Sequence, residues 1–123
     1  MTLVFVALGG AVGAAVRHLV DGAVANLVRS SLPWGTLVVN ISGSFVAGIL
    51  YAAAIERAVL PVDIRAPLMI GFLGAYTTFS TVMLDSWRLA ESGSLAVAMT
   101  NLARSALLGI IAVGLGLAFG RSL

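Results

Sequence analysis

The sequence predicts an all-α membrane protein with four transmembrane helices. Of its 123 residues, 60% are hydrophobic and only 10% are charged, and the mean hydropathy is +1.09. Four apolar segments each reach the length of about 20 residues that crosses a bilayer, and short polar connections separate them. A soluble domain of this size could not bury so much apolar surface.

The four spans are expected at about residues 2–19, 32–55, 66–89 and 95–120. No positive charge precedes the first apolar run, and Arg17 follows it, so we read this run as a retained span and not as a signal peptide. Pro33 and Pro67 lie near span starts, where a missing N–H costs least. Without a linker or a repeat, residues 1–123 are expected to form a single four-span domain.

The third span carries the most informative stretch, residues 71–81 with the sequence GFLGAYTTFST. Glycines and a run of hydroxyl residues are poor choices for an uninterrupted helix in lipid. Irregular backbone at membrane depth is tolerated only where protein or a water-filled cavity covers it, and broken helices commonly bind ions there. We therefore expect the third helix to be broken at mid-membrane, at a site that handles ions.

The charges are few and evenly divided between the two sides. The termini and the second connection contribute three arginines, and the opposite side also contributes three: Arg57, Arg65 and Arg121 against Arg17, Arg29 and Arg88. The positive-inside bias is nearly absent. Either the chain has too few charges to count, or it inserts both ways and pairs as an antiparallel dimer of dual topology. Four thin spans do not easily enclose a hydrated path, so an oligomer is expected either way.

Small and polar residues recur at helical spacing in several spans. The stripes at i, i+4 and i+8 are Asn40, Ser44 and Gly48 in the second span, and Asn101, Ser105 and Gly109 in the fourth. Polar groups are costly in lipid unless paired, so the stripes either hold helices together or line one path. Together with a broken third span, they favour a pore. Small-xxx-small pairs such as Gly9 with Gly13 and Gly116 with Gly120 predict close helix packing, most simply within the chain.

Other residues at membrane depth have less specific interpretations. Phe79 offers the positive edge of its ring to an anion, although a single Phe is usually packing bulk. Arg104 lies nine residues into the fourth span, about 13 Å by helical rise. It is expected either to pair with Asp85 or Glu91 or to line a vestibule that attracts anions. Asp85 is best read as the partner of a nearby arginine.

Several classes of function are disfavoured by what the chain lacks. The first, second and fourth spans carry no acid, whereas a proton-coupled exporter needs a titratable carboxylate in the membrane. The sequence has no Cys, no phosphate-binding loop and no catalytic constellation, and His18 is its only His. An enzyme is not expected. The net charge of +2 is too small to indicate a nucleic-acid partner.

Three motifs resemble the signatures of the Fluc-type, CrcB-like fluoride ion channel family: residues 9–17 (GGAVGAAVR), 35–40 (GTLVVN) and 71–81 (GFLGAYTTFST). Their order and spacing and the four-span length also match. The resemblance implies a passive fluoride-selective channel in the bacterial cell membrane that exports fluoride from the cytoplasm and relieves its toxicity. It further implies an antiparallel dimer in membrane lipid, with two narrow pores.

The resemblance also implies roles for individual residues. The backbone carbonyls of Gly74 and Thr77 would hold a structural sodium ion, Na⁺, at the dimer centre, and Arg17 would lie in a vestibule. The residues expected to line the fluoride pore are Asn40, Thr78, Phe79, Ser80, Thr81, Asn101 and Ser105.

Two positions depart from the family pattern. Val82 replaces the usual second pore phenylalanine, and Asp85 replaces the usual glutamate. The missing ring predicts either a slow homodimer or a heterodimer with a paralogous subunit. Two alternatives stay open: a small multidrug-type proton-coupled transporter, which is also a four-span dual-topology dimer, and a structural partner subunit without pore activity of its own.

Overall fold

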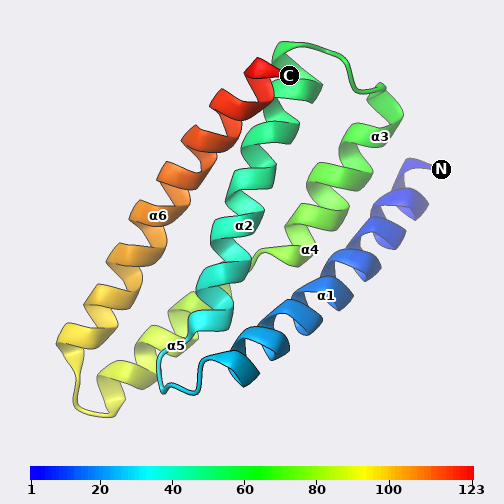
Figure 1. Ribbon diagram of the computed structural model, residues 1–123. Helices are drawn as coiled ribbons and strands as arrows, with labels where there is room; N and C mark the ends of the chain where they lie inside the picture. The colour runs from blue at the N-terminus through cyan, green and yellow to red at the C-terminus, as the bar shows by residue number, and fades with distance from the viewer.

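The computed structural model describes all 123 residues, and its regular structure is entirely helical. Four helical segments are long and apolar enough to cross a membrane. They run up and down in turn, so that the two termini lie at the same end of the bundle (Figure 1). The predicted fold class, an all-α four-span membrane protein, is therefore confirmed.

The first two spans are helices of unequal length. Helix α1 covers Thr2–Leu27, and α2 covers Trp34–Tyr51 and continues through the π-helical turn η1, Ala52–Glu56. The expected end of the first span near residue 19 is wrong. Asp21 and Asn26 lie beyond that expected end and still belong to α1, because no proline interrupts the helix beyond its apolar stretch.

The third span is built from four short elements. They are α3 (Val62–Ala66), the π-helical η2 (Pro67–Leu73), α4 (Gly74–Tyr76) and α5 (Phe79–Glu91). Pro67 cannot donate a backbone hydrogen bond, and the wider π-helical turns begin at that residue. Between α4 and α5, Thr77 and Thr78 have extended backbones, with ψ of 157° and 114°. The expected break in the third helix is confirmed at these two residues.

The break divides the third span between two neighbours. The half before it, η2 and α4, packs mainly against α1, whereas α5 packs mainly against α6 (Leu95–Ser122). A tight turn joins α5 to α6, and Gly93 adopts φ of 92° there, a conformation that glycine tolerates best. Helix α2 contacts both α1 and α6 and so connects the two pairs.

Close contacts between helices depend on glycine. A Cβ added to Gly48 would collide with the backbone of Val113 and Leu117 in α6, and one added to Gly13 would collide with the Phe72 carbonyl. The small-residue pairs therefore serve packing within the chain, as the sequence most simply predicted. Such contacts stabilise helix pairs in lipid, where apolar burial between helices contributes little.

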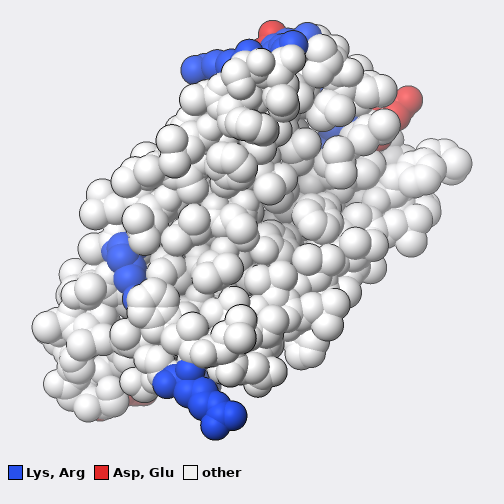
Figure 2. Space-filling view, viewed as in Figure 1, with Lys and Arg blue, Asp and Glu red and all other residues white.

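The outer surface is apolar along the length of the helices. Only 19 of the 123 residues are buried, and large side chains such as Leu3, Ile110 and Leu115 are exposed, as expected for a bundle that faces lipid. Charged side chains gather mainly at the two ends of the visible face (Figure 2). At the end with the termini, Arg121 forms a salt bridge with Glu56 of 2.6 Å, and Arg57 donates to the Gly120 carbonyl at 3.2 Å.

The contact between α2 and α6 predicts that Gly48→Ala destabilises the fold. The added methyl group meets backbone that cannot move aside, and overpacking of this kind costs about 1–3 kcal/mol. The measurement is the thermal midpoint of the purified protein in detergent. Gly114→Ala is the matched control, because nothing lies within 4 Å of its added Cβ. Equal midpoints for the two variants would contradict this account of the contact.

Candidate functional site

The centre of the site is a pair of hydrogen bonds between the Asn40 side chain and the broken backbone. Asn40 Nδ2 donates to the Thr78 carbonyl at 2.9 Å, and the Thr78 N–H donates to Asn40 Oδ1 at 2.8 Å. The carboxamide thus satisfies both backbone groups of one residue. Unpaired backbone groups are costly at membrane depth. This pair of bonds, called the clamp below, offsets the cost of breaking the helix here.

Helix α5 restarts immediately after the clamp. The Thr78 side chain is its N-cap, and Thr78 Oγ1 accepts a hydrogen bond from the Thr81 N–H at 3.3 Å. Thr78 Oγ1 also lies 2.9 Å from Thr81 Oγ1. Threonine is a preferred N-cap residue for this reason. The hydroxyl run that weakens the helix in the sequence therefore also begins the next helix.

The break frees carbonyls that a continuous helix would use, among them those of Gly74 and Thr77. In a continuous helix the Thr78 N–H would bond to Gly74 O, and the Thr81 N–H would bond to Thr77 O. Both donors are instead taken, by Asn40 Oδ1 and by Thr78 Oγ1. Arg17 Nη1 approaches Thr77 O at 3.4 Å. These two oxygens belong to the residues to which the family resemblance assigns sodium.

On one side of the break lies a groove of about 500 Å³ between α2, α6 and the third span. Its lining combines the two predicted stripes, with Asn40 and Ser44 from α2 and Ser105 from α6. Thr77, Thr78, Phe79 and Val82 also contribute to the wall, as do several apolar side chains. Phe79 is 77% exposed and so stands at the rim, whereas Val82 is buried.

On the other side of the break lies a smaller recess of about 200 Å³ between α1, α2 and α5. Arg17, Thr36, Thr78 and Thr81 line it, together with His18 and Asp21 of α1. Thr78 belongs to both hollows, so the clamped residue separates the groove from the recess. The two hollows therefore lie on either side of Thr78, at the break.

The structure distributes the predicted site residues among several places. Six of the predicted residues line the groove: Asn40, Gly74, Thr77, Thr78, Phe79 and Ser105. Arg17 and Thr81 lie in the recess. Ser80 is exposed and lines neither hollow. Asn101 is buried between α5 and α6, where its Nδ2 donates to Ser86 Oγ at 2.9 Å.

Thr36 is a site residue that was not predicted from the sequence. It lines the recess, and its Oγ1 donates to Asp85 Oδ2 at 3.4 Å. The signal was present in the sequence, since Thr36 lies one helical turn before Asn40 and extends the same stripe.

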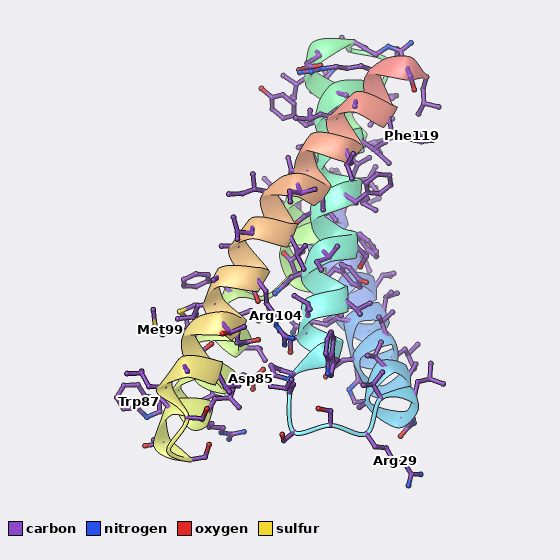
Figure 3. All side chains as sticks on the ribbon, turned by 60° about the vertical axis from the view of Figure 1, so that its left-hand side comes forward. Arg29, Asp85, Trp87, Met99, Arg104 and Phe119 are labelled. Atoms are coloured by element: carbon purple, nitrogen blue, oxygen red, sulfur yellow. The ribbon has the colours of Figure 1, made fainter.

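Two expected ion pairs do not form. Asp85 accepts from Thr36 and makes no salt bridge with an arginine. Arg104 pairs with neither Asp85 nor Glu91; it donates to Asn101 Oδ1 and lies 4.7 Å from the centre of the Trp34 ring. Arg104 reaches the start of α2 in this way (Figure 3), which explains how a cation within the fourth span is accommodated without an acidic partner.

The groove and the recess offer different groups, since Arg17, His18 and Asp21 line only the recess. The groove presents amide and hydroxyl donors and contains no acid, so it offers no group for proton coupling. Neutral donors can replace water around an anion without the tight hold of a buried arginine. The chain has no cluster of three or more His, Cys, Asp or Glu that could hold a metal, so a metal bound here would depend on carbonyl oxygens.

Comparison with known sequences agrees with this description. A sequence model of the family described as "CrcB-like protein, Camphor Resistance (CrcB)" matches residues 4–117. A protein of Magnetococcus marinus named "Fluoride-specific ion channel FluC" is 42% identical over 121 residues, which cover 98% of each chain. Proteins of the same name from Hahella chejuensis and Syntrophotalea carbinolica are 42% and 40% identical, over 97% and 100% of this chain and 94% and 100% of their own lengths.

These matches extend over almost the whole chain and include all four spans. The relatives are bacterial, and the four spans make this chain a multi-pass membrane protein. The chain belongs to the CrcB-like family, which is a family of ion channels and not of enzymes.

Proposed function

We propose that this chain is a subunit of a passive, fluoride-selective channel that exports fluoride across the bacterial cell membrane and so relieves its toxicity. The observation that carries the proposal is the clamped break, which separates a groove and a recess that both contain neutral donors. The name shared by relatives of full length supports fluoride as the anion.

The direction of transport follows from electrostatics. Hydrogen fluoride enters acidified cells as a neutral molecule and dissociates at the cytoplasmic pH. The negative interior potential then favours exit of the trapped anion, by about 2.3 kcal/mol for each 100 mV. No acid lines the groove, which supports a channel over the alternative of a small multidrug-type proton-coupled transporter.

One copy of the chain leaves the path incomplete, which supports a dimer. The ring of Phe79 is 77% exposed at the rim of the groove. Gly74 is also exposed, with open space where a side chain would stand. A second copy laid against this face would cover the rim and close the groove. The even division of arginines between the two sides supports an antiparallel arrangement of the copies.

The same face could hold a structural sodium ion at the centre of the dimer. The Gly74 and Thr77 carbonyls have lost their helical donors, and oxygen ligands suit a hard cation. Two oxygens from one chain are too few to replace a hydration shell, so the site would need the same two from a second copy. In this role the ion joins the subunits and is not transported.

Val82 bears on whether the channel is a homodimer or a heterodimer. It lies in the wall of the groove close to Phe79, and its isopropyl group has no positive ring edge to offer an anion. A homodimer would carry this deficiency at every equivalent position. In a heterodimer with a paralogous subunit, only half of these positions would lack the ring. If this chain then contributed no pore of its own, it would serve as a structural partner subunit.

Asn40→Ala is expected to lower fluoride efflux from liposomes by about tenfold or more. The change removes both bonds of the clamp, each worth ~1 kcal/mol, and about 1.4 kcal/mol in the barrier at the break corresponds to tenfold in rate. Efflux from the liposomes is measured with a fluoride electrode, and the liposomes contain protein purified at the size of a dimer. Thr100→Ala is the control, since this exposed hydroxyl bonds only to its own helix, at Ala96 O. Unchanged efflux in Asn40→Ala would mean that Asn40 only links the helices. Absence of efflux from the wild-type protein would refute the channel function.

The equal arginine counts predict that a C-terminal tag is found on both sides of the membrane. Tag accessibility is measured in spheroplasts before and after permeabilisation, since an outward tag reacts in both and an inward tag only in the second. Adding two arginines to the second connection should bias the population toward one orientation. A single orientation of the unmodified chain would refute dual topology and would favour a pair of paralogues of fixed orientation.

Val82→Phe is expected to raise fluoride efflux of the homodimer, and Phe79→Ile to lower it, because each changes the number of ring edges at the groove. The groove volume of about 500 Å³ can accept an added ring. Leu84→Phe is the matched control, because it adds the same ring to an exposed position of α5 outside the groove. If Val82→Phe forms a normal dimer without faster efflux, Val82 is an ordinary packing residue.

A further inference from the structure

Tyr76, the last residue of α4, forms a hydrogen bond to α2 that is separate from the clamp. Its hydroxyl lies 2.8 Å from Ser42 Oγ, and its buried ring stacks on Phe72 with the ring centroids 5.8 Å apart. Ser42 Oγ itself donates to the Val38 carbonyl at 2.7 Å, one turn earlier in its own helix. Because the Ser42 proton is used there, Tyr76 is the donor in the bond between the two hydroxyls.

The approach of Tyr76 to α2 depends on Gly43. A Cβ added to Gly43 would collide with the Thr77 methyl group and would lie 3.1 Å from the Tyr76 ring. The half of the third span before the break packs mainly against α1, and the contact at Ser42 and Gly43 joins its last residues to α2 as well. Helix α2 thus receives the chain immediately before the break.

Thr77 therefore lies between two attachments to the same helix. On one side, Tyr76 bonds to Ser42. On the other side, the Thr78 N–H donates to Asn40 Oδ1. The peptide unit that joins Thr77 to Thr78 is planar and trans, so its carbonyl points opposite to this N–H and away from Asn40. The clamp determines the direction of the Thr77 carbonyl, and Tyr76 determines where the residue that carries it is held.

We propose that Tyr76 is a positioning residue, whose bond to Ser42 holds the end of α4 so that the Thr77 carbonyl stays in place for a sodium ion. This inference rests on the sodium site of the proposed function. Tyr76 acts through the backbone of Thr77, because its own hydroxyl is turned toward α2. Each chain offers the ion only two carbonyl oxygens, so displacement of one of them weakens the binding of sodium.

The test is the sodium chloride concentration that gives half of the maximal rise in the thermal midpoint of the purified protein in detergent. Protein concentration is fixed, and N-methyl-D-glucamine chloride keeps the ionic strength constant. Tyr76→Phe keeps the ring and loses one hydrogen bond, which is expected to raise this concentration about fivefold. Ser42→Ala should have the same effect, and the double variant should show no further increase. Tyr51→Phe is the matched control, because the only other tyrosine is exposed.

A purely structural role of the bond predicts a different result. Tyr76→Phe would then lower the thermal midpoint equally at every sodium concentration and leave the half-maximal concentration unchanged, which would overturn the inference but not the sodium site. If Tyr76→Phe does not fold, Ser42→Ala decides the question by the same criterion. A wild-type midpoint that does not depend on sodium would refute the sodium site and the inference together. Fluoride efflux from liposomes tests the channel function separately.

Discussion

The structure depends on one constraint, the need to satisfy backbone groups where the third span stops being helical. In lipid this need is absolute, and a single carboxamide meets it by bonding to both the N–H and the carbonyl of Thr78. The groove and the recess meet at Thr78, and the Gly74 and Thr77 carbonyls lose their helical donors beside it. No other side chain type of the same length offers both an acceptor and a donor with this spacing. Asn40 therefore determines the shape of the site before it contributes any chemistry to it.

Composition and pattern were sufficient to predict the fold and the break. Apolar length predicted the four spans, and the glycines and hydroxyls of residues 71–81 predicted the interruption. The partner of the broken backbone could not be predicted in this way, because Asn40 and Thr78 are 38 residues apart and meet only after packing. The end of α1 was missed for a related reason. Hydropathy marks where lipid contact ends, whereas the helix continues into the polar region until the backbone changes at Val28.

Spacing along one helix also failed to separate residues that face different neighbours. Asn101 and Ser105 share a stripe, but only Ser105 lines the groove, because α5 packs against α6 at Asn101 and closes the space there. Arg104 was expected either to pair with an acid or to line a vestibule, and it instead contacts an aromatic face and an amide oxygen. The spacing in the sequence tells which face of its helix a residue occupies. Only the packing of the helices decides which neighbour that face contacts.

The division of the third span between α1 and α6 has a consequence for biosynthesis. Segments leave the ribosome in order, and the half before the break finds α1 and α2 already in the membrane. The half after it packs mainly against α6, which is the last span to be made. Until then α5 has few contacts with the other helices, and the groove lacks the wall that contains Ser105. A truncated chain that ends after the third span therefore lacks one wall of the groove and the main packing partner of α5.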